Sequence, residues 1–104
     1  MIIQINTDKT LSGDKRHQDY FSSQITEELE RFESHITRIE VHLKDENGNK
    51  DGVNDMSCVL EARLKGRQPI AVTSQADTIE LAVSGAIEKI KNSISTIVER
   101  TQNH

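Results

Sequence analysis

Basic side chains at a regular spacing are the residues of this sequence that could do chemistry. Arg63, Lys65 and Arg67 recur at every second position, a spacing that points side chains to one side of a strand. Cationic groups in such a row could neutralise successive phosphates of a nucleic acid. Further basic candidates on the predicted helices are Lys15, Arg16, Lys89 and Lys91. We take all of these as candidate nucleic-acid contacts; the competing interpretation is an ordinary surface of mixed charge.

Motifs for catalysis and metal binding are missing from the sequence. It contains no glycine-rich phosphate loop and no nucleophile elbow. The histidines are dispersed, at His17, His35, His42 and His104, and the single cysteine forms no thiolate cluster. Cys58 is expected to be a small core residue. We therefore expect no enzyme activity, no cofactor, no small-molecule substrate and no bound metal.

The segment Asp45-x-Asn47-x-Asn49 has the spacing of the first ligands in a calcium-binding loop. Such a loop needs Gly at its sixth position and Glu at its twelfth. Here those positions hold Lys50 and Met56. The segment is therefore predicted to be a mobile hairpin loop that binds no metal.

Length and composition bound the class of protein. With 104 residues, the chain is expected to form one domain over residues 1–104. The net charge of −4 argues against indiscriminate nucleic-acid binding, and three aromatic residues are too few for a base-stacking platform. One cysteine suits a reducing compartment, and no segment reaches the ~18–20 apolar residues of a membrane span. These features predict a cytoplasmic protein.

A long amphipathic helix is predicted from Asp77 to Arg100. Apolar residues recur there in steps of three and four, at Ile79, Val83, Ala86, Ile87, Ile90, Ile94, Ile97 and Val98. Asp77 with Glu80 three residues later is typical of a helix start. Gly85 in mid-helix costs about 1 kcal/mol relative to Ala, and we expect a strand to pack closely against it.

Shorter elements precede this helix. Period-two alternation predicts strands at Ile2–Thr7, Ile36–Lys44, Ser57–Lys65 and Ile70–Thr73. A helix from about Asp14 to Glu33 would bury Phe21, Ile25, Leu29 and Phe32. The order β-α-β-β-β-α predicts a parallel first strand pair, an antiparallel meander, and both helices on one sheet face. The fold class is therefore α+β, a two-layer sandwich with a four-stranded mixed sheet.

One shared core follows from this arrangement. We expect it to contain these residues of the two helices and the sheet: Phe21, Ile25, Leu29, Ile39, Val41, Leu60, Leu64, Ile87, Ile90 and Ile94.

The last helix carries a motif of a known family. Ala82-Val83-Ser84-Gly85-Ala86-Ile87-Glu88-Lys89-Ile90 resembles the pattern Ala-Ile-Asp-x-Ala-Val-Asp-Lys-Leu of the short ribosome-associated inhibitor and hibernation-promoting factors of bacteria, also called protein Y. The opening segment 3–6, the amphipathic first helix and the strand 39–43 also fit. The resemblance implies a fold similar to double-stranded RNA-binding domains. It also implies binding to the small ribosomal subunit and its RNA, with inhibition of translation in resting or stressed cells.

The chain departs from that family in its basic residues. Where the family continues with Arg-Gln and several lysines, this sequence has Asn92-Ser93-Ile94-Ser95-Thr96-Ile97-Val98. Phosphate neutralisation supplies much of the affinity for RNA, so this loss bears on function. Two hypotheses stay open: a non-catalytic ribosome-bound inhibitor, and a protein-interaction module of the same fold that no longer binds ribosomal RNA.

Overall fold

A computed structural model describes residues 1–7, 15–45 and 56–102, apart from the side chains of residues 15, 16, 101 and 102. Its elements, in chain order, are β1 (Ile2–Thr7), α1 (Lys15–Leu29), the 3-10 helix η1 (Glu30–His35), β2 (Ile36–Asp45), β3 (Met56–Leu64), β4 (Ile70–Ala76) and α2 (Ile79–Gln102). The hairpin loop predicted after Asp45 falls mostly on residues 46–55, outside the described residues. Its expected mobility and its expected lack of metal therefore stay predictions.

The four strands form one mixed sheet in the order β1-β2-β3-β4. β1 pairs parallel to β2, with Ile3 opposite Ile39 and Ile5 opposite Val41. The pairs β2–β3 and β3–β4 are antiparallel. This is the predicted topology, because a strand–helix–strand connection leaves its strands parallel whereas short connections leave them antiparallel.

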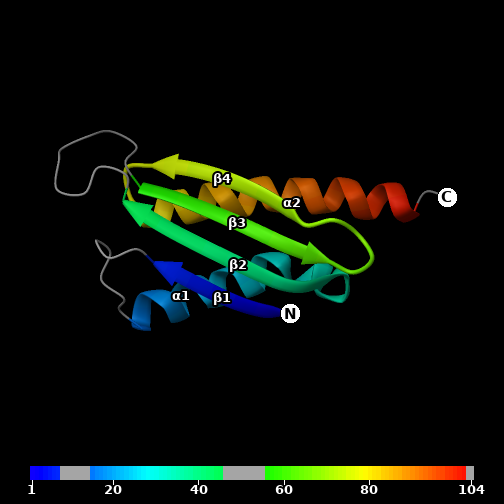
Figure 1. The fold of residues 1–104 in the computed structure, drawn as a ribbon, viewed down its shortest axis with the longest axis horizontal. Coiled ribbons are helices and arrows are strands. Elements are labelled where there is room, and N and C mark those ends of the chain that lie inside the picture. Colours follow the sequence, from blue (N-terminus) through cyan, green and yellow to red (C-terminus); the bar gives the residue numbers. More distant parts are fainter. Residues whose placement is uncertain (8–14, 46–55, 103–104) are drawn as a thin grey trace.

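Both helices lie on the same face of the sheet, behind the strands in the view of Figure 1. The core between the two layers contains every predicted core residue, together with other residues such as Ala82, Val83 and Cys58. The predicted α+β sandwich is therefore confirmed, and no helix among the described residues covers the other face of the sheet.

The first helix is shorter than predicted. α1 ends at Leu29, and a 3-10 helix continues to His35 instead of one α-helix running to Glu33. Leu29 and Phe32 are both buried, and their spacing of three suits the three residues per turn of a 3-10 helix. This tighter ending directs the chain straight into β2 at Ile36.

The N-cap of the second helix lies one residue after the predicted Asp77, and α2 itself begins at Ile79. Thr78 Oγ1 accepts a hydrogen bond from the Leu81 N–H at 3.2 Å, so Thr78 occupies the capping position that was assigned to Asp77. The close strand at Gly85 is confirmed. A Cβ built on Gly85 would overlap Ser74 Oγ on β4, so the absence of a side chain lets α2 lie directly on β4.

Candidate nucleic-acid interface

The open face of the sheet carries a lattice of alternating charges. In the β2–β3 register, Arg38 lies opposite Arg63 and Glu40 lies opposite Glu61. Like charges directly opposite one another are destabilising. Diagonal contacts relieve this, because Arg63 Nη2 lies 3.3 Å from Glu40 Oε2 and Arg63 Nε lies 3.4 Å from Glu61 Oε1. A phosphate that approached Arg63 would therefore compete with two carboxylates for its guanidinium.

The other two members of the predicted row leave the strand. β3 ends at Leu64, and the chain turns at Gly66, whose φ of 67° lies in the left-handed region. The Lys65 N–H donates to the His35 carbonyl at 3.0 Å, so the turn is held beside η1. Period-two alternation stops where the strand stops, and Lys65 and Arg67 are thereby separated from Arg63.

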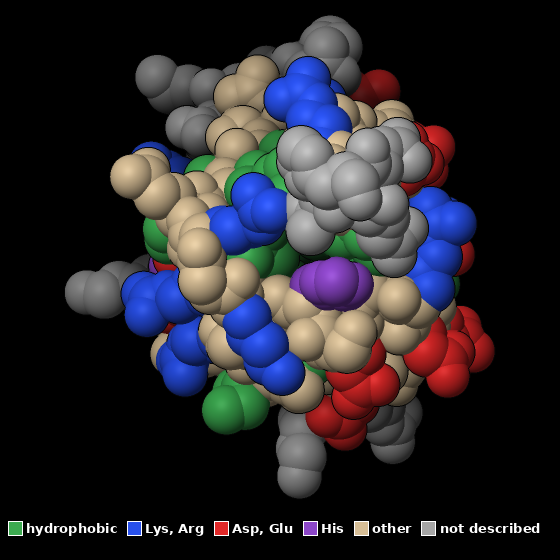
Figure 2. Space-filling model, turned by 90° about the vertical axis from the view of Figure 1, so that its right-hand side faces the viewer, with side chains coloured by type: hydrophobic (Ala, Val, Ile, Leu, Met, Phe, Trp, Pro, Cys, Tyr) green, Lys and Arg blue, Asp and Glu red, His purple; other side chains and the backbone are tan. Residues whose placement is uncertain are grey.

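Lys65 and Arg67 instead line a hollow at the end of the molecule. Its other lining residues are His35, Leu64, Gly66, Ile97 and Val98, and its volume is about 290 Å³. The residues come from four places in the fold: the end of η1, the end of β3, the β3–β4 turn and the last turns of α2. Figure 2 looks onto this end, where hydrophobic side chains reach the surface between Lys or Arg side chains and a His side chain.

The two predicted contacts on α2 bind their own chain. Lys89 Nζ donates a 2.6 Å hydrogen bond to the carbonyl of Thr73 on β4. Lys91 Nζ lies 2.9 Å from Glu28 Oε2 of α1. Both lysines are therefore partly neutralised or held within the molecule. Lys15 and Arg16 lie in the first turn of α1, and their side chains are outside the described part of the structure.

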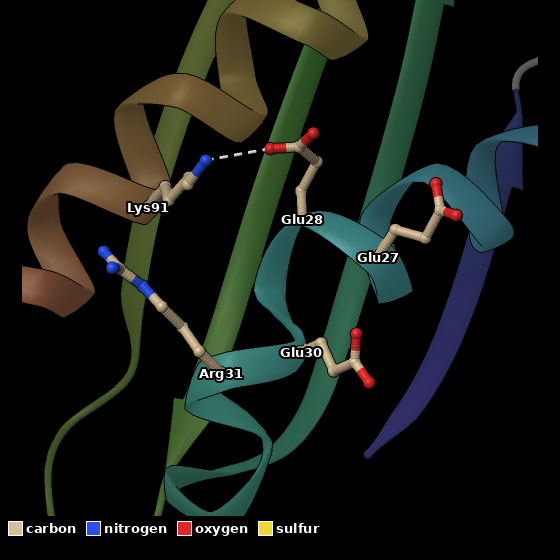
Figure 3. Close-up of a pocket in the computed structure, with 5 residues that line it drawn as sticks. All are labelled: Glu27, Glu28, Glu30, Arg31 and Lys91. Carbon is tan, nitrogen blue, oxygen red and sulfur yellow. Dashed lines mark hydrogen bonds and ion pairs between the residues drawn. The ribbon is translucent and has the colours of Figure 1, made fainter.

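The groove between α1 and α2 is acidic. Figure 3 shows Lys91 joined to Glu28 across it, with Arg31 reaching toward α2 and with Glu27 and Glu30 pointing away from α2. The exposed carboxylates continue into η1 at Glu33. Three carboxylates against two basic groups leave the lining of this groove slightly negative, so it favours a phosphate backbone less than a hollow lined by basic groups alone.

Charge is therefore divided between two sides of the molecule. In Figure 2 most Lys and Arg side chains lie toward the left, the side of the open sheet face, whereas Asp and Glu gather at the lower right, on the side of the helices. The net charge of the chain is −4. It nevertheless has a local basic region, formed by Arg63, Lys65 and Arg67, which a sum over the chain conceals.

His35 is a lining residue that the sequence does not single out. It belongs to no metal or catalytic spacing in the sequence, where the histidines are dispersed. His35 directly precedes β2, and the start of β2 lies beside the end of β3 because the two strands are antiparallel. This position is the signal that could have placed His35 near the β3–β4 turn.

Other chemistry has little support among the described residues. No group of three or more His, Cys, Asp or Glu residues in this part of the chain could hold a metal ion. None of the described helices combines the length and apolar character needed to cross a membrane. Cys58 is buried in the core, and burial raises the pKa of its thiol to about 12, so it is a poor nucleophile.

Comparisons with known proteins agree with this fold. Residues 6–102 match the sequence model of the family described as sigma 54 modulation protein / S30EA ribosomal protein. The N-terminal domain of Thermus thermophilus Protein Y is similar in structure, with a TM-score of 0.74 and 13% identity, covering 93% of this chain and 99% of that one. A ribosomal subunit interface protein from Coxiella burnetii has a TM-score of 0.64 and 15% identity, covering 95% and 99%. No curated protein matches the chain in sequence.

Proposed function

The chain belongs to the family of sigma 54 modulation and S30EA ribosomal proteins, and from this we propose a ribosome-associated function. The protein binds the small ribosomal subunit and inhibits translation in resting or stressed cells. It does so without catalysis, by occupying a site on the subunit. The observation that carries this proposal is the family match, which extends over nearly the whole chain.

The fold and its relatives support this function. A similar structure is that of a ribosomal subunit interface protein, and the sheet-and-two-helix arrangement is of the kind that recognises RNA by shape and backbone contacts. The proposed contacts are Arg63, Lys65 and Arg67, with Lys15 and Arg16. Lys89 and Lys91 contribute only where RNA displaces their present partners, Thr73 and Glu28.

A second function has its own supporting observation. Arg63 and Lys91 are paired with carboxylates, and the exposed side of α1 and η1 is acidic. A protein-interaction module that keeps the fold but does not bind ribosomal RNA would have these features. Its acidic helical side would then meet a protein partner.

Co-sedimentation with purified small subunits at several salt concentrations tests the proposal. We expect binding at low salt that weakens as salt rises, because RNA association releases counterions. Changing Arg63, Lys65 and Arg67 together to Gln is expected to weaken binding and flatten its salt dependence, by at most about 0.9 in the log–log slope for each lost phosphate contact. The protein is also expected to inhibit translation in a reconstituted extract.

The outcomes separate the two functions. An unmodified protein that fails to sediment with subunits even at low salt would leave only the interaction module. Tight binding that the triple substitution does not change would keep the ribosome as partner and move the interface elsewhere. The variant Arg38→Gln/Lys44→Gln is the comparison for charge removed from β2, at residues that are not among the proposed contacts.

A further inference from the structure

The hollow lined by His35, Leu64, Lys65, Gly66, Arg67, Ile97 and Val98 has the composition of a small binding pocket. We propose that it takes one unpaired nucleotide of RNA, with the base against the apolar residues and the phosphate on Lys65 and Arg67. The choice of RNA as the ligand rests on the proposed function. The inference adds a mode of contact, a base held out of its stack, that the fold alone does not imply.

The apolar wall supplies the surface for a base. Leu64 is buried, and Ile97 and Val98 are partly buried residues that pack against the core at the end of α2. These side chains are therefore anchored, and their outer atoms face the hollow. The flat face of a base can cover such a wall and remove apolar surface from water, which is favourable in proportion to the area covered.

The charged rim supplies the site for a phosphate. Lys65 and Arg67 stand on the five-residue connection between β3 and β4, and the His35 ring adds a nitrogen that can donate or accept a hydrogen bond. No carboxylate lines this hollow among the residues that the structure describes. The groove of Figure 3, in contrast, is lined by three carboxylates, those of Glu27, Glu28 and Glu30, beside the two basic groups of Arg31 and Lys91. Charge complementarity thus selects the end hollow for an anion.

Gly66 keeps the mouth of the hollow open. A Cβ at this position would meet no atom within 4 Å, so the space beside it is empty. Its positive φ places the backbone of the turn in a conformation that other residues rarely adopt. A larger residue at position 66 would both strain the turn and project a side chain from the rim.

Size and composition favour a single nucleotide over a duplex. A volume of about 290 Å³ is at the small end for ligand sites, which span roughly 300–1,000 Å³. Unpaired bases are the parts of RNA that proteins read in pockets, by stacking and by edge contacts. The apolar wall of this hollow can supply the stacking surface in a protein with few aromatic residues.

An adjacent hollow limits how far the ligand extends. It shares His35 and Val98 with the first and is also lined by Arg31, Phe32, Ser95 and Glu99. Glu99 is an acceptor for the Ser95 hydroxyl at 3.1 Å and brings a carboxylate to this side. A second phosphate is therefore disfavoured there, and the site holds one nucleotide.

Nuclear magnetic resonance of the folded, isotope-labelled protein tests the pocket directly. Adenosine 5′-monophosphate, adenosine and inorganic phosphate are titrated separately at pH 7. We expect adenosine 5′-monophosphate to shift both the Lys65–Arg67 amides and the methyl signals of Leu64, Ile97 and Val98, with affinity in the millimolar range or weaker. Inorganic phosphate is expected to shift the turn amides alone. Identical shifts from both probes, or no methyl shifts, would overturn the pocket.

Charge-removal variants distinguish the local effect of the basic residues in the hollow from the effect of the overall charge of the protein. Lys65→Gln/Arg67→Gln is expected to weaken the nucleotide affinity by about tenfold or more, because charge-assisted hydrogen bonds are lost. Arg38→Gln/Lys44→Gln removes the same number of charges from β2, outside the hollow, and is expected to leave the affinity unchanged. Equal weakening in both variants would mean that only the overall charge attracts the nucleotide and would overturn the pocket. The same spectra report whether each variant is folded.

The sedimentation experiment keeps this inference distinct from the proposed function. Ribosome binding without nucleotide-induced methyl shifts would refute the pocket and leave the function standing. Methyl shifts that require Lys65 and Arg67, in a protein that does not bind subunits, would support the pocket and refute the function.

Discussion

At the scale of the residue, Cys58 shows how burial decides chemistry. It lies on β3 opposite Leu43 of β2 and Ser74 of β4, with its side chain in the core. Desolvation disfavours the thiolate, so the pKa of the thiol rises from 9.0 to about 12. Below pH 9 the thiol is protonated in the folded and the unfolded protein, and its contribution to stability does not depend on pH.

Above pH 9 the two states differ. The unfolded chain releases the proton while the native state retains it, so the free energy of unfolding falls between pH 9 and 12, with a slope of at most about 1.4 kcal/mol per pH unit. Denaturant unfolding of the wild type and of Cys58→Ala across this range measures the effect. The two proteins differ only at residue 58, so the steeper fall of the wild type isolates the thiol. Parallel curves would contradict the account.

At the scale of the element, the contact between α2 and β4 depends on Gly85. In an exposed helix interior, replacing Gly by Ala stabilises by about 1 kcal/mol. Here the new Cβ would overlap Ser74 Oγ on the neighbouring strand, and Ser74 is itself buried. Overpacking of this kind costs typically about 1–3 kcal/mol, which exceeds the gain in helix propensity.

We therefore expect Gly85→Ala alone to lower the free energy of unfolding. In a Ser74→Ala background the clashing oxygen is gone and the remaining Cβ lies at an ordinary 3.4 Å, so the same substitution should stabilise by about 1 kcal/mol. A double-mutant cycle of thermal or urea unfolding measures this change of sign. If Gly85→Ala had the same effect in both backgrounds, the Ser74 hydroxyl would rotate away from the new Cβ and the overlap would not decide the sign of the change.

At the scale of the whole molecule, the distribution of charge decides which surface meets RNA. The molecule extends 51 Å along its longest axis and 20 Å along its shortest, whereas salt screens charges beyond roughly 8 Å at physiological ionic strength. The basic region and the acidic helical side therefore act on a ligand separately. Within the basic region, Arg63 is in ion pairs with Glu40 and Glu61, and Lys65 and Arg67 line the end hollow.

This difference predicts unequal contributions to ribosome binding. Arg63→Gln should reduce the salt-dependence slope by clearly less than the about 0.9 expected for a full phosphate contact, because its guanidinium is already shared with carboxylates. Lys65→Gln should reduce it by more. Conversely, Glu40→Gln/Glu61→Gln should strengthen binding by releasing Arg63. Sedimentation of these variants at a series of salt concentrations ranks the contributions of the residues to binding. A larger effect of Arg63→Gln than of Lys65→Gln would place the interface on the open face of the sheet.

The sequence by itself determined the elements and the fold, because their signals are local. Periodicities of two and about 3.6 in the hydrophobic residues place the strands and helices to within a few residues, and their order leaves few topologies for a sheet covered on one face. The buried positions follow from the same periodicities. The shift from an α-helix to a 3-10 helix after Leu29 was missed, because spacings of three and four are both compatible with an α-helix until the neighbouring strand sets the ending.

Only the tertiary structure decided the partners of the basic residues. Lys91 pairs with Glu28, 63 positions away in the chain, and Arg63 pairs with Glu40, 23 positions away. No spacing rule predicts such pairs, because each depends on the strand register and on how α1 and α2 lie across the sheet. The same holds for the end hollow. His35, Lys65 and Val98 come together there only because the β2–β3, β3–β4 and β4–α2 connections bring their elements to one end of the molecule. Local periodicity specifies which face of an element is buried, whereas contacts between exposed side chains follow from the global arrangement.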